Sequence, residues 1–276
     1  MKRIVAAIFA TLSMTTTAQA QIVHSHNDSS RLAPFHDAYA YGAEILGIEV
    51  AMHNGEIIAL SNNEVAAQCP TMEELYLTPI KSSMDAGRNV DLTLLIDAKG
   101  NETTLLTLFK LINERYTEII GEKKIKFIVH SNVPKADVLA KYPDYVMFDS
   151  SIHPLYSAEQ LNRVALFSEE FGVYSGWNGL EGMSTEDIKR VTAVIKKAHA
   201  QGKPIRFIDT PDNVNTWVTL SNMGADVINT EQVLLCCNMF NEVLAKRDDA
   251  IALQFPHNKK GSHTSIRSKT VRTRAN

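Results

Sequence analysis

The chain has 276 residues, a hydrophobic fraction of 45% and a formal net charge of −3. A chain of this length can bury one large core, which suits either one α/β barrel or two small domains. Its three cysteines, Cys69, Cys236 and Cys237, are too few for a disulfide framework, although one bridge to Cys69 fits an oxidising compartment, and their spacing excludes a structural zinc site.

Residues 1–20 have the pattern of a secretory signal peptide. A basic start (KR) is followed by an apolar run at residues 4–14, which is too short to span a bilayer, and by a small-x-small cleavage pattern (AQA). We predict a Sec signal peptide with cleavage after Ala20, and a periplasmic or secreted mature protein; a buried N-terminal helix is the alternative. No other stretch is apolar over ~20 residues, so we expect no transmembrane segment.

The remaining chain alternates between short apolar, β-branched runs and longer segments with helical periodicity. In chain order, we predict strands at residues 22–23, 45–52, 90–96, 125–130, 145–148, 165–167, 205–208 and 227–228. We predict helices after them at residues 34–41, 72–86, 102–119, 134–141, 158–162, 185–200, 214–223 and 232–245. This alternation is typical of consecutive βα units.

Local signals support this interpretation. Ser184 and the acidic residues after it predict a helix start, and Gly202 predicts its end. Eight βα units in ~235 residues predict a single (β/α)8 TIM barrel of the α/β class, and Asn54-Gly55 predicts a small β-hairpin after strand 2. A doubly wound open sheet is the competing fold, and it is disfavoured because no glycine-rich phosphate loop follows an early strand.

We place the barrel at residues 21–256 and a basic, disordered tail at residues 257–276. The tail has six Lys/Arg and no Asp/Glu, and the leader has two more positive charges, so the barrel segment has a net charge of −11. A polar tail without apolar periodicity is typical of disorder. The tail either touches anionic surfaces or is simply solvated, and we expect no nucleic acid partner.

Polar residues follow the predicted strands, at the barrel rim where active sites form. His24 and His26 follow the first strand, Glu49 lies in the second, and Asp97 and Lys99 follow the third. The remaining strands deliver His130, Asp149, Ser168, Trp177, Asn178, Asp209, Thr210, Asn229 and Thr230.

Glu49 lies among apolar residues, where a carboxylate is costly unless it is paired or bound to a metal. Glu49 and Asp97 from neighbouring strands can hold one Mg²⁺ or Ca²⁺, which prefer oxygen ligands. A salt bridge between Glu49 and Lys99 is an equal alternative. His26 is a candidate general acid/base, although a histidine near a strand end also serves as a plain hydrogen-bonding residue.

Several motifs, taken together and in order, resemble a known superfamily. They are HSHND, the helix at Pro34-Phe35, IEV, LLIDAK, GWNG, AHAQGKPIRFIDTPDN and GADVINTE. Residues 22–240 are similar to the phosphatidylinositol-phospholipase-C-like phosphodiesterase superfamily, and within it to bacterial glycerophosphodiester phosphodiesterase-like TIM barrels. The segment at residues 198–231 is the most specific part of this resemblance.

The resemblance implies metal-assisted acid/base cleavage of a small phosphodiester or lipid head group, with one divalent cation, Ca²⁺ or Mg²⁺. Carried over position by position, it makes His26 catalytic, Glu49 and Asp97 metal ligands, and Lys99 a catalytic residue that stabilises negative charge on the phosphate. It also implies substrate-binding roles for Asn27, Trp177, Asn178 and Thr210.

The chain departs from the family pattern at two positions. Ala51 stands where an aspartate ligand is expected, and Ser61, followed by Asn62, stands where a second catalytic histidine is expected. His53, on the same side of the strand as Glu49, is a candidate replacement, and a solvated hairpin histidine is the alternative.

These departures leave more than one function open. The first is an extracytoplasmic phosphoric diester hydrolase with reduced competence. The second is a catalytically inactive barrel that binds a phosphorylated or polyol ligand. A glycosidase that uses Glu49 and Asp97 ranks last, because HSHND has no role in such chemistry.

Overall fold

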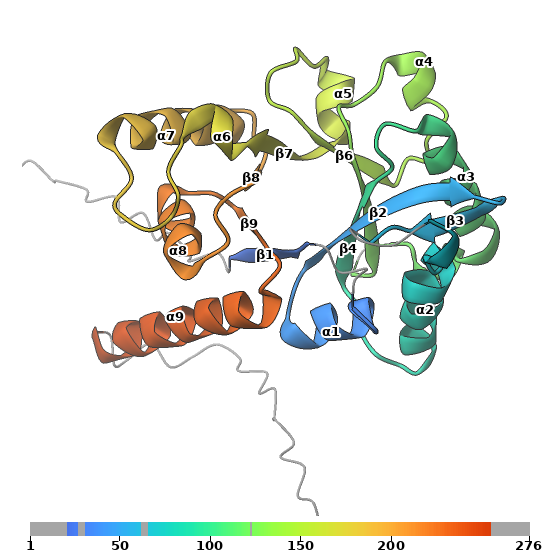
Figure 1. The fold of residues 1–276 in the computed structure, drawn as a ribbon, viewed down its shortest axis with the longest axis horizontal. Coiled ribbons are helices and arrows are strands. Elements are labelled where there is room, and N and C mark those ends of the chain that lie inside the picture. The colour runs from blue at the N-terminus through green and yellow to red at the C-terminus, as the bar shows by residue number, and fades with distance from the viewer. Residues whose placement is uncertain (1–20, 27–30, 62–65, 122, 255–276) are drawn as a thin grey trace, which may run out of the picture. The chain divides into compact units, whose positions relative to one another are not determined.

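The computed structural model describes residues 21–26, 31–61, 66–121 and 123–254 (Figure 1). The predicted signal peptide, the whole of the predicted tail and Asn27 lie outside this part of the chain. The chain divides into two compact units, residues 1–240 and 241–276, and the barrel lies in the first. In the described ranges, no helix combines the length and apolarity that crossing a bilayer demands.

Within the described residues, eight parallel strands close into a barrel, which confirms the predicted fold. They are β1 (Ile22–Ser25), β2 (Ile45–His53), β4 (Leu92–Asp97), β5 (Ile125–His130), β6 (Val146–Ser150), β7 (Val164–Glu170), β8 (Ile205–Ile208) and β9 (Val227–Thr230). The strand order is β1-β9-β8-β7-β6-β5-β4-β2, and the ring closes because β1 also pairs with β2, with His24 opposite Ile45.

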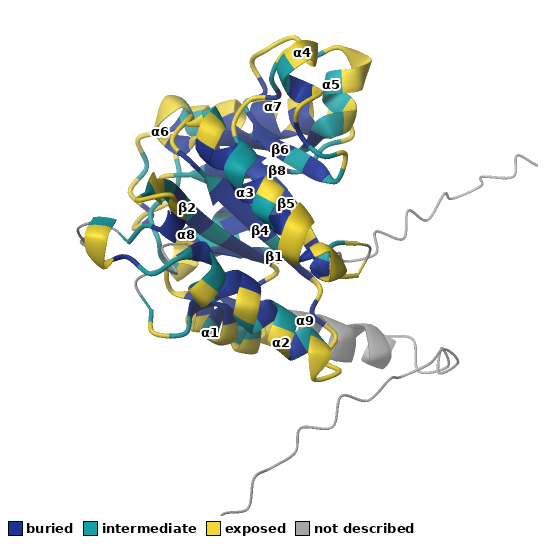
Figure 2. Ribbon diagram, turned by 90° about the vertical axis from the view of Figure 1, so that its right-hand side faces the viewer, coloured by how far each residue is buried: buried dark blue, intermediate teal, exposed yellow. Residues whose placement is uncertain are grey.

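Helices surround the strands (Figure 1). They are α1 (Pro34–Tyr41), α2 (Thr78–Asp85), α3 (Glu102–Arg115), α4 (Ala136–Leu139), α5 (Ala158–Arg163), α6 (Phe171–Tyr174), α7 (Thr185–Ala200), α8 (Val214–Met223) and α9 (Val233–Gln254). A π-helical turn, Glu73–Leu77, leads into α2, and short 3₁₀ turns form at Ala66–Gln68 and Thr117–Ile119. Figure 2 shows that strands are mostly buried while the outer faces of the helices are exposed.

The structure confirms the predicted hairpin. β3 (Glu56–Ala59) pairs antiparallel with the end of β2, and the turn residues Asn54 and Gly55 have φ angles of 50° and 88°. Glycine and asparagine tolerate this left-handed region, which a tight hairpin requires. After β3, the Leu60 N–H donates to the Glu49 carbonyl oxygen at 2.8 Å, so the hairpin returns the chain to the rim beside Glu49.

The barrel interior is apolar at one end and polar at the other. A small apolar cluster, separate from the main core, fills one end with Ile45, Leu95, Ile128, Leu166 and Val227. Side chains alternate between the two sides of a strand, so the residue two positions further along each strand points inward again. Those next inward residues are Gly47, Asp97, His130, Ser168 and Asn229. The carboxyl end of the interior is therefore polar, as the active end of this fold requires.

The N-terminal cap of α7 contributes to stability in a way that a mutation can test. The Ser184 side chain accepts a hydrogen bond from the Asp187 N–H at 3.1 Å. We expect Ser184→Ala to lower the free energy of unfolding by about 1 kcal/mol, because an N-terminal N–H loses its partner. Urea unfolding measures this change. Ser184→Asp is the control that keeps a capping oxygen, and an equal loss in both variants would refute the cap's contribution.

Candidate active site

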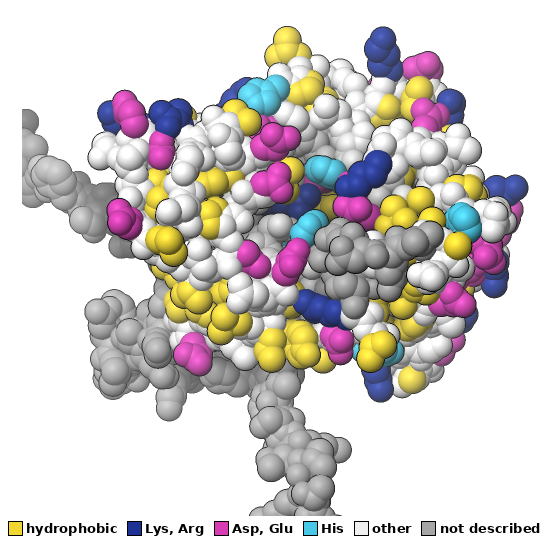
Figure 3. All heavy atoms as spheres, in the orientation of Figure 1, with side chains coloured by type: hydrophobic (Ala, Val, Ile, Leu, Met, Phe, Trp, Pro, Cys, Tyr) yellow, Lys and Arg dark blue, Asp and Glu magenta, His cyan; other side chains and the backbone are white. Residues whose placement is uncertain are grey.

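A cavity of about 270 Å³ opens at the carboxyl end of the barrel strands. Figure 3 shows acidic, basic and histidine side chains gathered around a hollow on this face. The residues that line the cavity are His24, His26, Gly47, Ile48, Glu49, Leu60, Leu95, Asp97, Lys99, His130, Arg206, Ile208, Asp209 and Asn229. Segments far apart in the sequence therefore supply one site.

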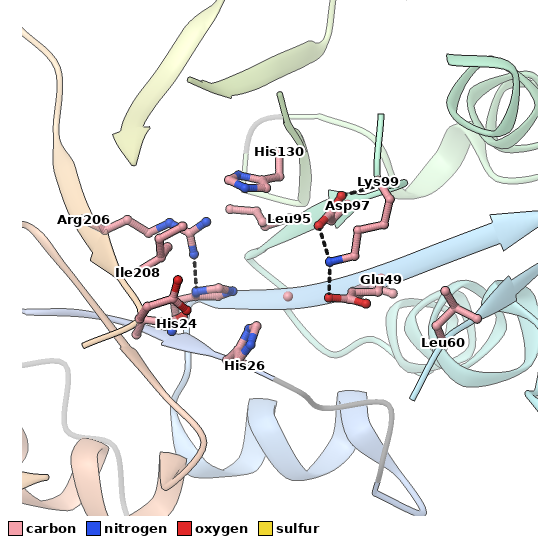
Figure 4. Close-up of a pocket in the computed structure, with 14 residues that line it drawn as sticks. His24, His26, Glu49, Leu60, Leu95, Asp97, Lys99, His130, Arg206 and Ile208 are labelled. Carbon is pink, nitrogen blue, oxygen red and sulfur yellow. Dashed lines mark hydrogen bonds and ion pairs between the residues drawn. The ribbon is translucent and has the colours of Figure 1, made fainter. Parts of the chain in front are cut away.

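The two candidate metal-binding carboxylates lie side by side and share one ammonium group. Glu49 pairs with Asp97 in the register of β2 and β4. The Lys99 Nζ lies 2.5 Å from Glu49 Oε1 and 2.9 Å from Asp97 Oδ2 (Figure 4). Burial of the ammonium lowers the pKa of Lys99, but its hydrogen bonds to the two carboxylates outweigh this effect, and the pKa lies above its ordinary value.

The backbone of Lys99 is also unusual. Its φ angle is 49°, in the left-handed region that is uncommon for residues other than glycine, and its N–H donates to Asp97 Oδ1 at 2.7 Å. Asp209, which also lines the cavity, has a φ of 55°. Unfavourable backbone conformations of this kind cluster at functional sites.

A buried ion pair forms the wall of the cavity opposite Lys99. The Arg206 guanidinium donates to Asp149 Oδ2 at 2.6 Å and to Ser168 Oγ at 2.5 Å, and both charged side chains are buried. The Ser168 hydroxyl donates to the other Asp149 oxygen. Burial raises the pKa of Asp149, but the Arg206 charge and the hydrogen bond from His130 outweigh it, so this pKa lies below its usual value.

His24 is held in its neutral form. Arg206 Nη1 lies 2.5 Å from His24 Nδ1, and since a guanidinium only donates, this ring nitrogen accepts. Burial, followed by the charge of Arg206, lowers the pKa of His24 well below its usual value. Gly47 leaves room for the ring, because an added Cβ there would lie 2.5 Å from His24 Nε2.

Two buried charged residues, Arg206 and Glu169, were not predicted from the sequence to have a role. Glu169 accepts hydrogen bonds from Ser151 Oγ at 2.9 Å, from the Ile152 N–H at 2.8 Å and from the Tyr174 hydroxyl at 2.6 Å, so it anchors the loop after β6. The signal that singled out Glu49, a charge within an apolar strand, was also present at Arg206 in PIRFI.

The structure brings four of the predicted site residues together: His26, Glu49, Asp97 and Lys99 all line the cavity. The other described ones lie outside the lining. His53 is in the hairpin, where its ring contacts Asn54 Nδ2 at 3.1 Å. The remaining three are Trp177, which donates to the Glu181 carbonyl, Asn178, which accepts from the Leu180 N–H, and Thr210, which follows Asp209.

The donor set bears on the predicted cation. Among the described residues, no group of three or more His, Cys, Asp or Glu side chains is arranged to hold a metal ion. Glu49 and Asp97 supply two carboxylates, which is the protein contribution that Mg²⁺ commonly takes together with water and substrate phosphate, whereas Ca²⁺ takes six to eight oxygen ligands. The pair therefore fits Mg²⁺ when the Lys99 ammonium moves aside.

Comparison with protein-family models finds no match, and comparison with curated proteins finds none. Among solved structures, the chain is similar to a glycerophosphodiester phosphodiesterase from Parabacteroides distasonis ATCC 8503, with a TM-score of 0.54 and 12% identity over 83% of this chain and 98% of that chain. It is also similar to a protein assigned as a glycerophosphoryl diester phosphodiesterase from Agrobacterium tumefaciens str. C58, with a TM-score of 0.50 and 10% identity over 82% and 100% of the two chains. At this identity, the similarity shows a shared barrel fold.

The lowered pKa of His24 predicts how stability depends on pH. Below the ordinary histidine value of about 6.5, the unfolded chain takes up a proton that folded His24 does not, so stability falls as the pH falls. One such proton gives a slope of up to about 1.4 kcal/mol per pH unit. We expect His24→Asn to flatten the decline between about pH 6.5 and 5.5, measured by urea unfolding. His53→Asn is the matched control, and an equal change of slope in both variants would contradict the assignment to His24.

Proposed function

We propose that the chain is an extracytoplasmic phosphoric diester hydrolase that acts on glycerophosphodiesters or related lipid head groups. The observation that supports this most strongly is the convergence of His26, Glu49 and Asp97 in one cavity at the carboxyl end of the barrel. The cavity volume of about 270 Å³ suits a small head group rather than a whole lipid.

The charges in the cavity favour a cation bound together with the substrate. Glu49, Asp97 and Asp209 are acidic, while Lys99 and Arg206 are basic. The Arg206 charge already pairs with Asp149 behind the cavity. An anionic phosphodiester therefore enters a site with an acidic excess, which one divalent cation, Mg²⁺ or Ca²⁺, on Glu49 and Asp97 would offset. When bound, such a cation polarises a phosphoryl oxygen as a Lewis acid.

The side chains of this chain have separate parts in the proposed reaction. His26, at the end of β1, moves a proton to or from the reacting oxygen. Lys99, once released from the carboxylates, places its ammonium near the negative oxygens of the phosphate. Arg206 stays fixed by its buried partners and limits how deep the ligand can enter.

A specific observation favours a second candidate, a barrel that binds a phosphorylated or polyol ligand without cleaving it. Lys99 already pairs with the carboxylates of Glu49 and Asp97. Ala51 stands where the family resemblance implies a metal ligand, and Ser61 stands where it implies a catalytic acid. Ligand binding without turnover, seen as a rise in melting temperature with glycerophosphocholine, would support this candidate over the hydrolase.

The hydrolase predicts that purified protein releases choline from glycerophosphocholine in the presence of Mg²⁺ or Ca²⁺. We expect His26→Ala to lower kcat by about 10²–10⁴, because one proton transfer is lost. His36→Ala, a histidine of α1 that does not line the cavity, is the matched control. Equal rates for wild type and His26→Ala would refute the role of His26.

Competition between Lys99 and the cation gives a test that does not depend on activity. We expect Lys99→Met to increase the rise in melting temperature that Mg²⁺ causes, because the two carboxylates lose their ammonium partner. Glu49→Gln should abolish that rise. Lys81→Met, which removes a surface ion pair with Asp85, is the control. An unchanged response to Mg²⁺ in Lys99→Met would argue against a cation on these carboxylates.

A further inference from the structure

His130 lines the cavity and has no part in the proton transfers assigned to His26. It ends β5, lines the cavity, and has a side chain that is 33% exposed. Its Nδ1 lies 2.7 Å from Asp149 Oδ2, and that carboxylate is fully buried. A partly exposed imidazole thus forms a hydrogen bond through one nitrogen to a buried acid.

The hydrogen bond to Asp149 determines which nitrogen of the His130 ring faces a ligand. The Asp149 carboxylate is ionised and only accepts, so His130 Nδ1 carries the proton that it donates. Nε2 is then the nitrogen that exchanges a proton with a bound molecule, and the adjacent carboxylate stabilises the imidazolium when Nε2 is protonated. The same relation between acid, imidazole and substrate operates in other acid/base sites.

The carboxylate that orients His130 is itself held rigidly. Asp149 also accepts hydrogen bonds from Ser168 and Arg206, which come from β7 and β8. The protein therefore holds the His130 imidazole in one orientation, as preorganised sites require.

The barrel order places His130 and His26 on different walls of the cavity. β1 and β5 are separated by β2 and β4, and Figure 4 shows the two imidazoles on opposite sides of the cavity. Lys99 follows β4, and Arg206 lies in β8, which is four positions from β4 in the ring of eight strands. Attacking and leaving oxygens lie roughly in line in phosphoryl transfer, so acid and base groups on opposite sides of the phosphorus suit it.

We propose that His130, oriented by Asp149, is the general acid for the leaving alcohol, the role that Ser61 cannot fill. This inference rests on the proposed hydrolase. A water oxygen forms the new bond to phosphorus and gives up one proton to His26. The bond from phosphorus to the leaving oxygen breaks, its electron pair stays on that oxygen, and the oxygen takes the proton from His130 Nε2. Asp149 is a positioning residue.

Two substrates with different leaving groups test this role. Glycerophosphocholine releases an alcohol that needs protonation, whereas bis-p-nitrophenyl phosphate releases a stable phenolate that does not. We expect His130→Ala to lower kcat by about 10²–10⁴ on glycerophosphocholine and by less than about fivefold on bis-p-nitrophenyl phosphate. Added imidazole should restore part of the lost activity on glycerophosphocholine.

The matched control is His153→Ala, an exposed histidine that contacts Glu169 and does not line the cavity. It should leave both rates within about twofold of wild type. Equal losses on both substrates in His130→Ala, without rescue by imidazole, would overturn the acid role and leave the hydrolase standing. Wild-type protein that turns over neither substrate would overturn the hydrolase, and the role of His130 with it.

Discussion

The ion pair between Arg206 and Asp149 is the constraint on which the polar half of the barrel depends. Two charges removed from water are costly, and their attraction offsets the cost only when other hydrogen bonds satisfy the remaining atoms. Here Ser168, His24 and His130 supply those bonds, so side chains from β1, β5, β6, β7 and β8 converge on one pair of charges. Loss of either charge would leave the other uncompensated, at a cost of about 3–5 kcal/mol. The same hydrogen bonds that offset this cost hold the imidazoles of His24 and His130 at the floor and wall of the cavity.

Strand alternation explains why this polar layer lies directly beneath the cavity. Along β2, the inward positions run from Ile45 through Gly47 to Glu49, so an apolar floor, a space for the His24 ring and a carboxylate follow one another. A side chain at position 47 would collide with that ring. The smallest residue of the strand therefore lies where the neighbouring strand contributes its largest polar group.

Sequence alone could predict the barrel because each βα unit carries its own periodicity, and α1, α7, α8, β5 and β8 have the predicted bounds. Strand ends were less predictable: β7 extends to Glu170 because its backbone pairs with β8 beyond the apolar run. The predicted helix at 102–119 divides at Tyr116, whose φ of −136° ends α3.

In the site, rim residues could be found because they follow strands, whereas Arg206 lies within one and its partner Asp149 is 57 residues away. Whether Glu49 binds a metal or forms a salt bridge depends on the position of the Lys99 side chain, which the spacing of residues in the sequence does not determine.

In the proposed hydrolase, Lys99 would link the binding of a cation to the binding of a phosphodiester. In the structure its ammonium satisfies both carboxylates, so a cation that takes those oxygens must release it. A released ammonium is a good partner for phosphate oxygens, and a bound phosphate therefore makes the release less costly. Each ligand then favours the other, and because such coupling is reciprocal, the factor by which phosphate strengthens cation binding equals the factor by which the cation strengthens phosphate binding. The lysine that satisfies both carboxylates is thus also what would make the proposed cation site respond to substrate.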